Sequence, residues 1–177
     1  EARRFASVDA LWRKNMADTV DEPRFMAAAE RDGLLKKFIS ANQKLDEIQK
    51  GLNDYLETKR LYFPRFFFLS NDELLEILSQ TKEPRAVQPH LGKCFEGCNK
   101  VKFEKDLKIT QMISSEGEQV DLKTVVDPES RANKGNVEMW LLELEANQWE
   151  AIKDSTARSM IDYANTERTQ WTHNWPA

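Results

Sequence analysis

The feature that most constrains the fold is a junction at residues 62–78, where one helix must end and another must begin. Its first half carries five aromatic side chains within seven positions, together with one proline (Tyr62, Phe63, Pro64, Arg65, Phe66, Phe67, Phe68). Pro64 stops a helix that arrives from upstream, because proline lacks the backbone N–H and clashes with the preceding turn. Ser70 and Glu73 match a capping box, in which each side chain accepts a backbone N–H at the start of a new helix.

We predict that seven residues build this junction: Phe63, Pro64, Phe66, Phe67, Phe68, Ser70 and Glu73. Phe66, Phe67 and Phe68 are expected to hold the two helices together, with the Phe67 ring buried. Ser70 and Glu73 are expected to open the second helix at about residues 71–79, and its apolar face is made of leucine and isoleucine.

Upstream of the junction, apolar residues recur at alternating spacings of four and three (Leu34, Phe38, Ala41, Leu45, Ile48, Leu52, Tyr55). This pattern predicts a helix at about residues 34–60, roughly 40 Å long at 1.5 Å per residue. One interpretation is a stiff rod or a dimerising coiled coil. The other is one helix of an antiparallel bundle, which we favour because about three heptads are marginal for an isolated coiled coil.

Two shorter helices are expected before residue 34. Ser7 is a candidate N-cap for the first, which carries Trp12 on its apolar face. Pro23 suits the first position of the second, with Phe25 and Met26 turned inward.

The periodicity changes from helical to alternating beyond residue 100. Leu107, Ile109, Gln111 and Ile113 share one face of a predicted strand, and residues 120–126 form the next. Gly117 lies in the turn between them, where a positive φ is needed. Residues 101–103 are a candidate third strand.

After a polar loop, a helix of about 28 residues is expected from Val137, paired with the long helix at residues 34–60. Trp12, Trp140 and Trp149 are expected to be core or groove anchors, whereas Trp171 and Trp175 are expected to be packed by sequence beyond this segment. The predicted fold class is mainly α (α+β), an elongated antiparallel helical bundle with an inserted β-hairpin. The domain boundaries fall at 1–100 (helical), 101–126 (β-hairpin) and 127–177 (long helix and aromatic tail).

The charge balance excludes some partners. Lys and Arg number 26 against 30 Asp and Glu. This near balance argues against nucleic acid or an anionic membrane as the main partner. No apolar run approaches the roughly 20 residues that a membrane helix needs. Two cysteines are too few for a disulfide scaffold and suit a reducing compartment.

The sequence carries no complete motif of a catalytic or cofactor site. Gly92 and Lys93 lack the first glycine and the hydroxyl of a phosphate-binding loop. His90, Cys94 and Cys98 have helical spacing for a zinc site, but Gly97 should end the helix before Cys98 and no fourth ligand is specified. We therefore expect a partly exposed histidine and two reduced thiols, and no catalytic, cofactor or metal site in this segment.

The predicted hairpin turn carries two acids, Glu116 and Glu118, with Lys123 nearby. They are either a docking point for a basic surface or a solvated turn, which is the commoner state of such tips.

Four stretches carry a resemblance to a known family: residues 63–78, 87–91, 93–97 and 114–118. They resemble the linker region of dynein heavy chains of the axonemal (ciliary and flagellar) type, and the similarity covers most of the chain. The resemblance implies the carboxyl-terminal part of the linker, just before the first AAA+ module of the motor ring. In that family the linker bends and straightens as ATP is hydrolysed, which moves the motor along microtubules.

The resemblance further implies that ATP and magnesium belong to the ring of a longer chain and not to this segment. The implied partners are that ring, with Glu116 and Glu118 as candidate contacts, microtubules, and dynein light and intermediate chains. The implied location is the cytoplasm and the cytoskeleton of the cilium or flagellum. The alternative is a non-catalytic helical protein-interaction module with a Trp-rich groove.

Overall fold

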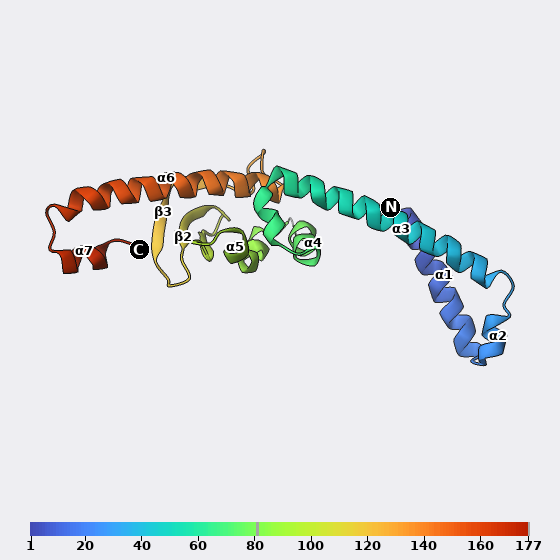
Figure 1. Cartoon of the computed structure of the whole chain (residues 1–177). Helices are drawn as coiled ribbons and strands as arrows, with labels where there is room; N and C mark the ends of the chain where they lie inside the picture. Colours follow the sequence, from blue (N-terminus) through green and yellow to red (C-terminus); the bar gives the residue numbers. More distant parts are fainter. Residues whose placement is uncertain (81, 177) are drawn as a thin grey trace. The chain divides into compact units, whose positions relative to one another are not determined.

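The computed structural model describes residues 1–80 and 82–176, and the chain divides into two compact units at residues 1–57 and 58–177 (Figure 1). The boundary between them falls within one helix, α3 (Leu34–Tyr62). The described residues are mainly helical, with one small antiparallel sheet, which confirms the predicted fold class.

The first unit holds α1 (Ala2–Asp21), α2 (Phe25–Ala29) and most of α3. Polar contacts join α1 to α3: Arg4 pairs with Glu47 at 3.3 Å, and Lys44 Nζ donates to Ser7 Oγ at 3.3 Å. The Trp12 and Phe38 ring centroids are 6.3 Å apart. This contact within one chain is the packing that the bundle interpretation predicts.

Several details of the first unit differ from the sequence-based expectation. Ser7 lies inside α1, where its hydroxyl donates to the Arg4 carbonyl oxygen, so its prediction as an N-cap is wrong. The second helix begins at Phe25 and not at Pro23. Phe25 and Met26 are exposed and not turned inward, because no element of this unit covers them among the described residues.

The second unit contains the end of α3 and all remaining elements. These are η1 (Pro64–Phe68), α4 (Asn71–Ser79), η2 (Pro84–Val87), α5 (Gln88–Cys94), β1 (Lys100–Phe103), β2 (Ile109–Ile113), β3 (Gln119–Val126), α6 (Val137–Tyr163) and α7 (Arg168–Asn174). The strands form an antiparallel sheet in the order β1-β2-β3, with the predicted third strand present.

Helix α6 packs on the sheet through β3 (Figure 1). The predicted pairing of this helix with the long helix at residues 34–60 involves both units and stays a prediction. Within the second unit, an ion pair between Lys59 and Glu138 joins the end of α3 to the start of α6. An apolar face opposite a sheet has the same sequence pattern as one opposite a helix, so the periodicity of α6 does not distinguish the two partners.

The hairpin follows the prediction at its turn and departs from it at one bulge. Gly117 has φ +90°, as the turn requires. The strand register shifts between Ile109 and Gln111. Ile109 and Met112 are therefore the buried residues of β2, and Gln111, expected on the same face as Ile109, is not.

The outer edge of β1 is covered by a side chain. Gln88 Nε2 donates to the Val101 carbonyl oxygen at 2.6 Å, and Gln88 Oε1 accepts from the Val101 N–H at 3.0 Å. One side-chain amide thus imitates a neighbouring strand and protects part of an edge that would otherwise be open to pairing with another chain.

The tryptophans divide between core and surface. Trp140 is buried as predicted, but Trp12 and Trp149 are exposed, at 55% and 60%. The two tryptophans of the tail pack within the chain, contrary to expectation. Trp171 Nε1 donates to the Ser159 carbonyl oxygen and Trp175 Nε1 to Asp162 Oδ2, both at 2.8 Å.

Candidate functional site

The centre of the second unit is a cluster of three aromatic rings at the junction. The Phe63 and Phe66 rings meet edge to face with centroids 5.0 Å apart, and the Phe95 ring lies 6.0 Å from Phe63. All three side chains are buried. Phe63 and Phe66, two of the seven predicted junction residues, therefore lie in the core of this unit.

Phe67 and Phe68 do not share this burial, and the prediction that the Phe67 ring is buried is wrong. They are 60% and 70% exposed. The reason is the 3₁₀ geometry of η1, which has three residues per turn. Residues 63, 66 and 69 therefore lie on the inner side, and the next positions point outward.

Two arginines next to the aromatic cluster donate hydrogen bonds to the surrounding elements. Arg60, near the end of α3, donates to the Leu69 carbonyl oxygen at 3.1 Å and to Asn71 Oδ1 at 2.8 Å. Arg65 Nε donates to Glu145 Oε1 of α6 at 2.6 Å, and its Nη1 donates to the Cys94 carbonyl oxygen at 3.0 Å. These contacts connect η1 to α3, α4, α5 and α6. Sequence analysis did not assign Arg65 a role. Its position as the one cation within the aromatic residues 62–68 is the signal that could have indicated it.

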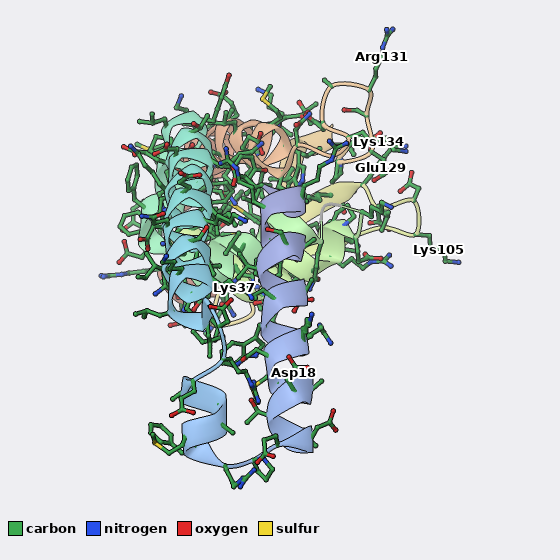
Figure 2. All side chains as sticks on the ribbon, turned by 90° about the vertical axis from the view of Figure 1, so that its right-hand side faces the viewer. Asp18, Lys37, Lys105, Glu129, Arg131 and Lys134 are labelled. Carbon is green, nitrogen blue, oxygen red and sulfur yellow. The ribbon has the colours of Figure 1, made fainter. Side chains whose placement is uncertain are left out.

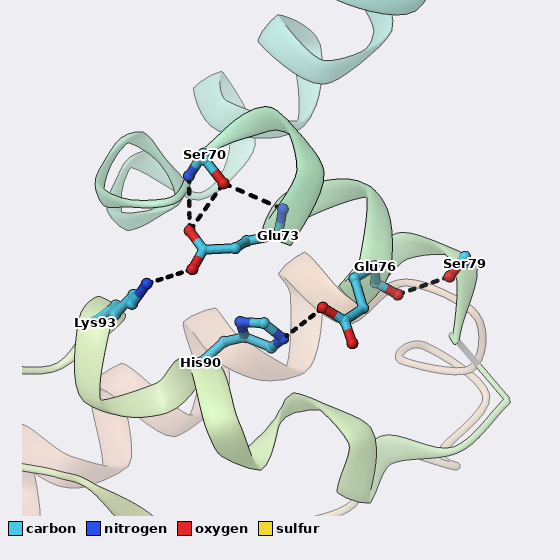
Figure 3. Close-up of polar contacts among 6 residues, drawn as sticks. All are labelled: Ser70, Glu73, Glu76, Ser79, His90 and Lys93. Atoms are coloured by element: carbon cyan, nitrogen blue, oxygen red, sulfur yellow. Dashed lines mark hydrogen bonds and ion pairs between the residues drawn. The ribbon is translucent and has the colours of Figure 1, made fainter.

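The predicted capping box is present at the start of α4 (Figure 3). The Glu73 N–H donates to Ser70 Oγ at 3.3 Å, and the Ser70 N–H donates to Glu73 Oε2 at 2.9 Å. The second carboxylate oxygen of Glu73 pairs with Lys93 of α5, an interaction that sequence reasoning missed. Lys93 and then Ser70 lower the pKa of Glu73 to about 2, because both stabilise the carboxylate.

The residues considered for a metal site do not come together. α5 ends at Cys94, so Cys98 lies beyond the helix, where its thiol donates to the Lys100 carbonyl oxygen. His90 is buried, not partly exposed as expected, and its Nε2 lies 3.6 Å from Glu76 Oε2 (Figure 3). Within residues 1–80 and 82–176, no group of three or more potential ligands is close enough to hold a metal ion.

Both thiols are buried. Burial raises the pKa of Cys94 to about 11 and also raises that of Cys98. A thiol is nucleophilic as the thiolate, so these side chains remain protonated and unreactive near neutral pH.

The hairpin turn that carries Glu116 and Glu118 is held by one serine. Ser114 Oγ accepts from the N–H groups of both glutamates, at 3.3 and 3.2 Å. Glu116 is exposed and Glu118 is half-buried. The two candidate contact residues therefore sit on a defined turn.

Other charged loops of the second unit also point outward. Lys105 lies in the β1–β2 loop and Arg131 in the loop before α6, and both side chains extend away from the ribbon (Figure 2). Lys134 of the latter loop pairs with Glu129 at 3.1 Å. Both of these loops thus carry basic and acidic side chains.

A groove of about 590 Å³ lies between α6 and the hairpin. Trp149 and Ile152 line it from α6, and Met112 and Val120 line it from β2 and β3. The sequence predicted Trp149 to be a core or groove anchor, but it could not indicate the opposite wall, since Met112 and Val120 lie about 30 or more positions away in the chain.

The comparisons with known proteins agree with one another. Residues 1–159 match the family model described as "Dynein heavy chain, N-terminal region 2". The chain is 49% identical over 176 residues to dynein axonemal heavy chain 12 of Rattus norvegicus, 47% to dynein axonemal heavy chain 3 of Mus musculus and 46% to dynein axonemal heavy chain 1 of Mus musculus. These matches cover 99% of this chain, but only 6% of the first relative and 4% of the other two.

Among the described residues, no helix combines the length and the apolar composition needed to cross a bilayer.

Proposed function

Because the chain belongs to the dynein heavy chain family, as part of N-terminal region 2, we propose that it is a mechanical linker segment of an axonemal dynein heavy chain. It transmits ATP-driven changes of the AAA+ ring into movement along microtubules, and it lies in the carboxyl-terminal part of the linker. Its location is the axonemal cytoskeleton of the cilium or flagellum. The observation that carries the proposal is the junction around Phe63 and Phe66, which joins α3, α4, α5 and α6 through buried rings and arginine contacts.

A force-transmitting segment needs elements that move together. Packed interiors resist small deformations, so an aromatic cluster tied to four helices keeps its shape under load. Arg60 and Arg65 add hydrogen bonds to carbonyl groups at chain turns, where the backbone would otherwise deform most easily.

The segment itself catalyses no reaction in this proposal, and ATP and magnesium bind elsewhere in the longer chain. Steady-state ATP turnover by the purified segment above the rate of a heat-treated sample would contradict it.

The hairpin turn is the proposed contact with the ring. Glu116 and Glu118 offer negative charge on a turn that Ser114 holds in place, so a basic surface is the expected partner. Light and intermediate chains of dynein are candidate partners of the longer chain.

The test is charge reversal in the complete heavy chain. Glu116→Lys/Glu118→Lys should leave the melting temperature of the segment within about 2 °C, because the exposed Glu116 and the half-buried Glu118 lie on a surface turn, where charges contribute little to stability. Microtubule gliding should slow at least about threefold, and Glu116→Gln/Glu118→Gln should slow it less. Asp46→Lys, an exposed charge on α3, is the control. Unchanged gliding with the reversed pair would remove the hairpin from the mechanism.

A further inference from the structure

The groove between α6 and the hairpin has an apolar wall that the described residues leave partly uncovered. Trp149 is 60% exposed and Ile152 is 50% exposed, and both line the groove from α6. Met112 and Val120, which are paired across β2 and β3, line it from the sheet. Contact between apolar surface and water is unfavourable, and a contiguous apolar surface commonly marks an interface. We therefore expect this wall to be covered in the longer chain.

The tail of the chain returns to the same groove. Pro176, which follows α7, lines the groove together with Ile152 and Thr156 of α6. Figure 1 shows that the tail runs back along α6 towards β3. The end of the described chain is thus part of the groove wall.

Two contacts with α6 fix the place where the tail reaches the groove. Trp175 Nε1 donates to Asp162 Oδ2 at 2.8 Å, and the Arg158 guanidinium carbon lies 5.7 Å from the centroid of the Trp175 ring. Asp162 and Arg158 belong to the α6 turns that follow Thr156. Pro176 therefore reaches the groove at its Thr156 end, with the apolar wall ahead of it.

The proposed heavy chain continues beyond this segment. The family region that matches residues 1–159 is an N-terminal one, and the chain spans only 6% of its relative from Rattus norvegicus. The residues that follow 177 start at the groove and need no long connection to reach it. A tethered segment has a high effective concentration at such a site, which favours it over a free partner of equal intrinsic affinity.

The length of the groove indicates how much chain it can hold. Its α6 wall runs from Glu145 to Thr156, which is about 16 Å at 1.5 Å per residue. An extended segment of about five residues has the same length at 3.3 Å per residue. Alternate side chains of an extended segment point to the same side, so apolar residues are expected at every second position.

We propose that the groove docks the polypeptide that directly follows residue 177, as an extended segment whose apolar side chains pack on Trp149 and Ile152. This inference rests on the proposed function, which supplies the longer chain. Docking joins α6, the hairpin and the tail into one packed structure. Glu118 lines the groove and also belongs to the proposed ring contact, so only the apolar residues of the groove are assigned to the docked segment.

The test places a photoreactive side chain on the groove wall of the complete heavy chain. Trp149→p-benzoylphenylalanine, when irradiated, should cross-link to a peptide within about ten residues after residue 177, which is twice the length that the groove holds. Mass spectrometry identifies the cross-linked peptide. Ile152→p-benzoylphenylalanine is a second probe of the same wall and should give the same product.

The matched control is Ile161→p-benzoylphenylalanine. Ile161 is an exposed apolar residue of α6 that does not line the groove. A photoreactive side chain at this position should give no cross-link to the segment after residue 177.

Hydrogen exchange in the complete heavy chain measures the docking independently. The amides of the segment after residue 177 should exchange at least about tenfold faster in Trp149→Ala than in the unchanged chain, because local opening removes their protection. Ile161→Ala should leave their exchange unchanged. Neither measurement depends on movement along microtubules, so a failure of this proposal is distinguishable from a failure of the linker function.

Several outcomes would overturn the proposal. Cross-links from both groove positions to a separate protein, to a second copy of this chain or to a distant part of the same heavy chain would assign the groove to that occupant. Cross-linking from both groove positions no stronger than from position 161 would show that the wall stays uncovered. Equal exchange rates in Trp149→Ala and the unchanged chain would show that the segment does not depend on the groove.

Discussion

Each of the two units is stabilised internally by a different kind of interaction. In the first, α1 and α2 contain no buried residue, and the contacts between α1 and α3 include an ion pair, a side-chain hydrogen bond and one ring contact at the surface. In the second, the rings of Phe63, Phe66 and Trp140 are buried together with most of the core residues. Since burial of apolar surface is the main driving force of folding, the second unit is expected to be the more stable.

The sharpest test of this difference is made at the junction, where neighbouring phenylalanines have opposite environments. Phe66→Ala should lower the free energy of unfolding by about 3–5 kcal/mol, because it leaves a cavity in the core. Phe67→Ala should cost less than about 1 kcal/mol, since most of that ring remains in water. Urea unfolding followed by circular dichroism measures both. Equal losses would mean that the Phe67 ring is covered in solution.

The ion pair between Lys59 and Glu138 tests the second unit by a different route. Lys59→Met should cost about 3 kcal/mol, because it leaves the buried Glu138 carboxylate without its cation. The double variant Lys59→Met/Glu138→Leu should recover most of that loss, as the uncompensated charge is gone. A double variant as unstable as the single one would show that packing and not charge is responsible.

A smaller effect is expected from the same type of substitution in the first unit. Trp12→Ala should cost about 1 kcal/mol, which is the value of an aromatic pair in partial contact with water. Hydrogen exchange should show amides of α1 losing protection well before those of α6. Slower exchange in α1 than in α6 would reverse the proposed order of stability.

The smallest expected effect is a dependence on pH. The pKa of Glu73 is about 2 in the folded chain, below its ordinary value near 4.5. The folded state therefore favours the carboxylate, so this contribution is complete above about pH 4.5 and is lost as the pH falls towards 2. Glu73→Gln should flatten the fall of the melting temperature within that interval only. An unchanged slope in this variant would assign the acid sensitivity to other carboxylates.

The sequence predicted the local features of the junction and the hairpin well. The capping box of Ser70 and Glu73, the helix stop before Pro64 and the positive φ of Gly117 are all present. Each of these depends on bonds and contacts within about four residues, so the information lies in one short stretch. The charged contacts were missed, because Lys93 and Glu145 reach the junction from elements 20 and 80 residues away from their partners.

What the sequence determined by itself was therefore the position and type of most elements, and the family to which the chain is similar. Only the tertiary structure decided which side chains of those elements are covered. It placed Phe66 inside and Phe67 outside through the three-residue turn of η1, and it buried Trp140 but left Trp149 on a groove. It also folded the tail back, so that Trp171 and Trp175 bond to α6. The physical reason is that backbone geometry depends on neighbours in sequence, whereas burial depends on which distant surfaces meet.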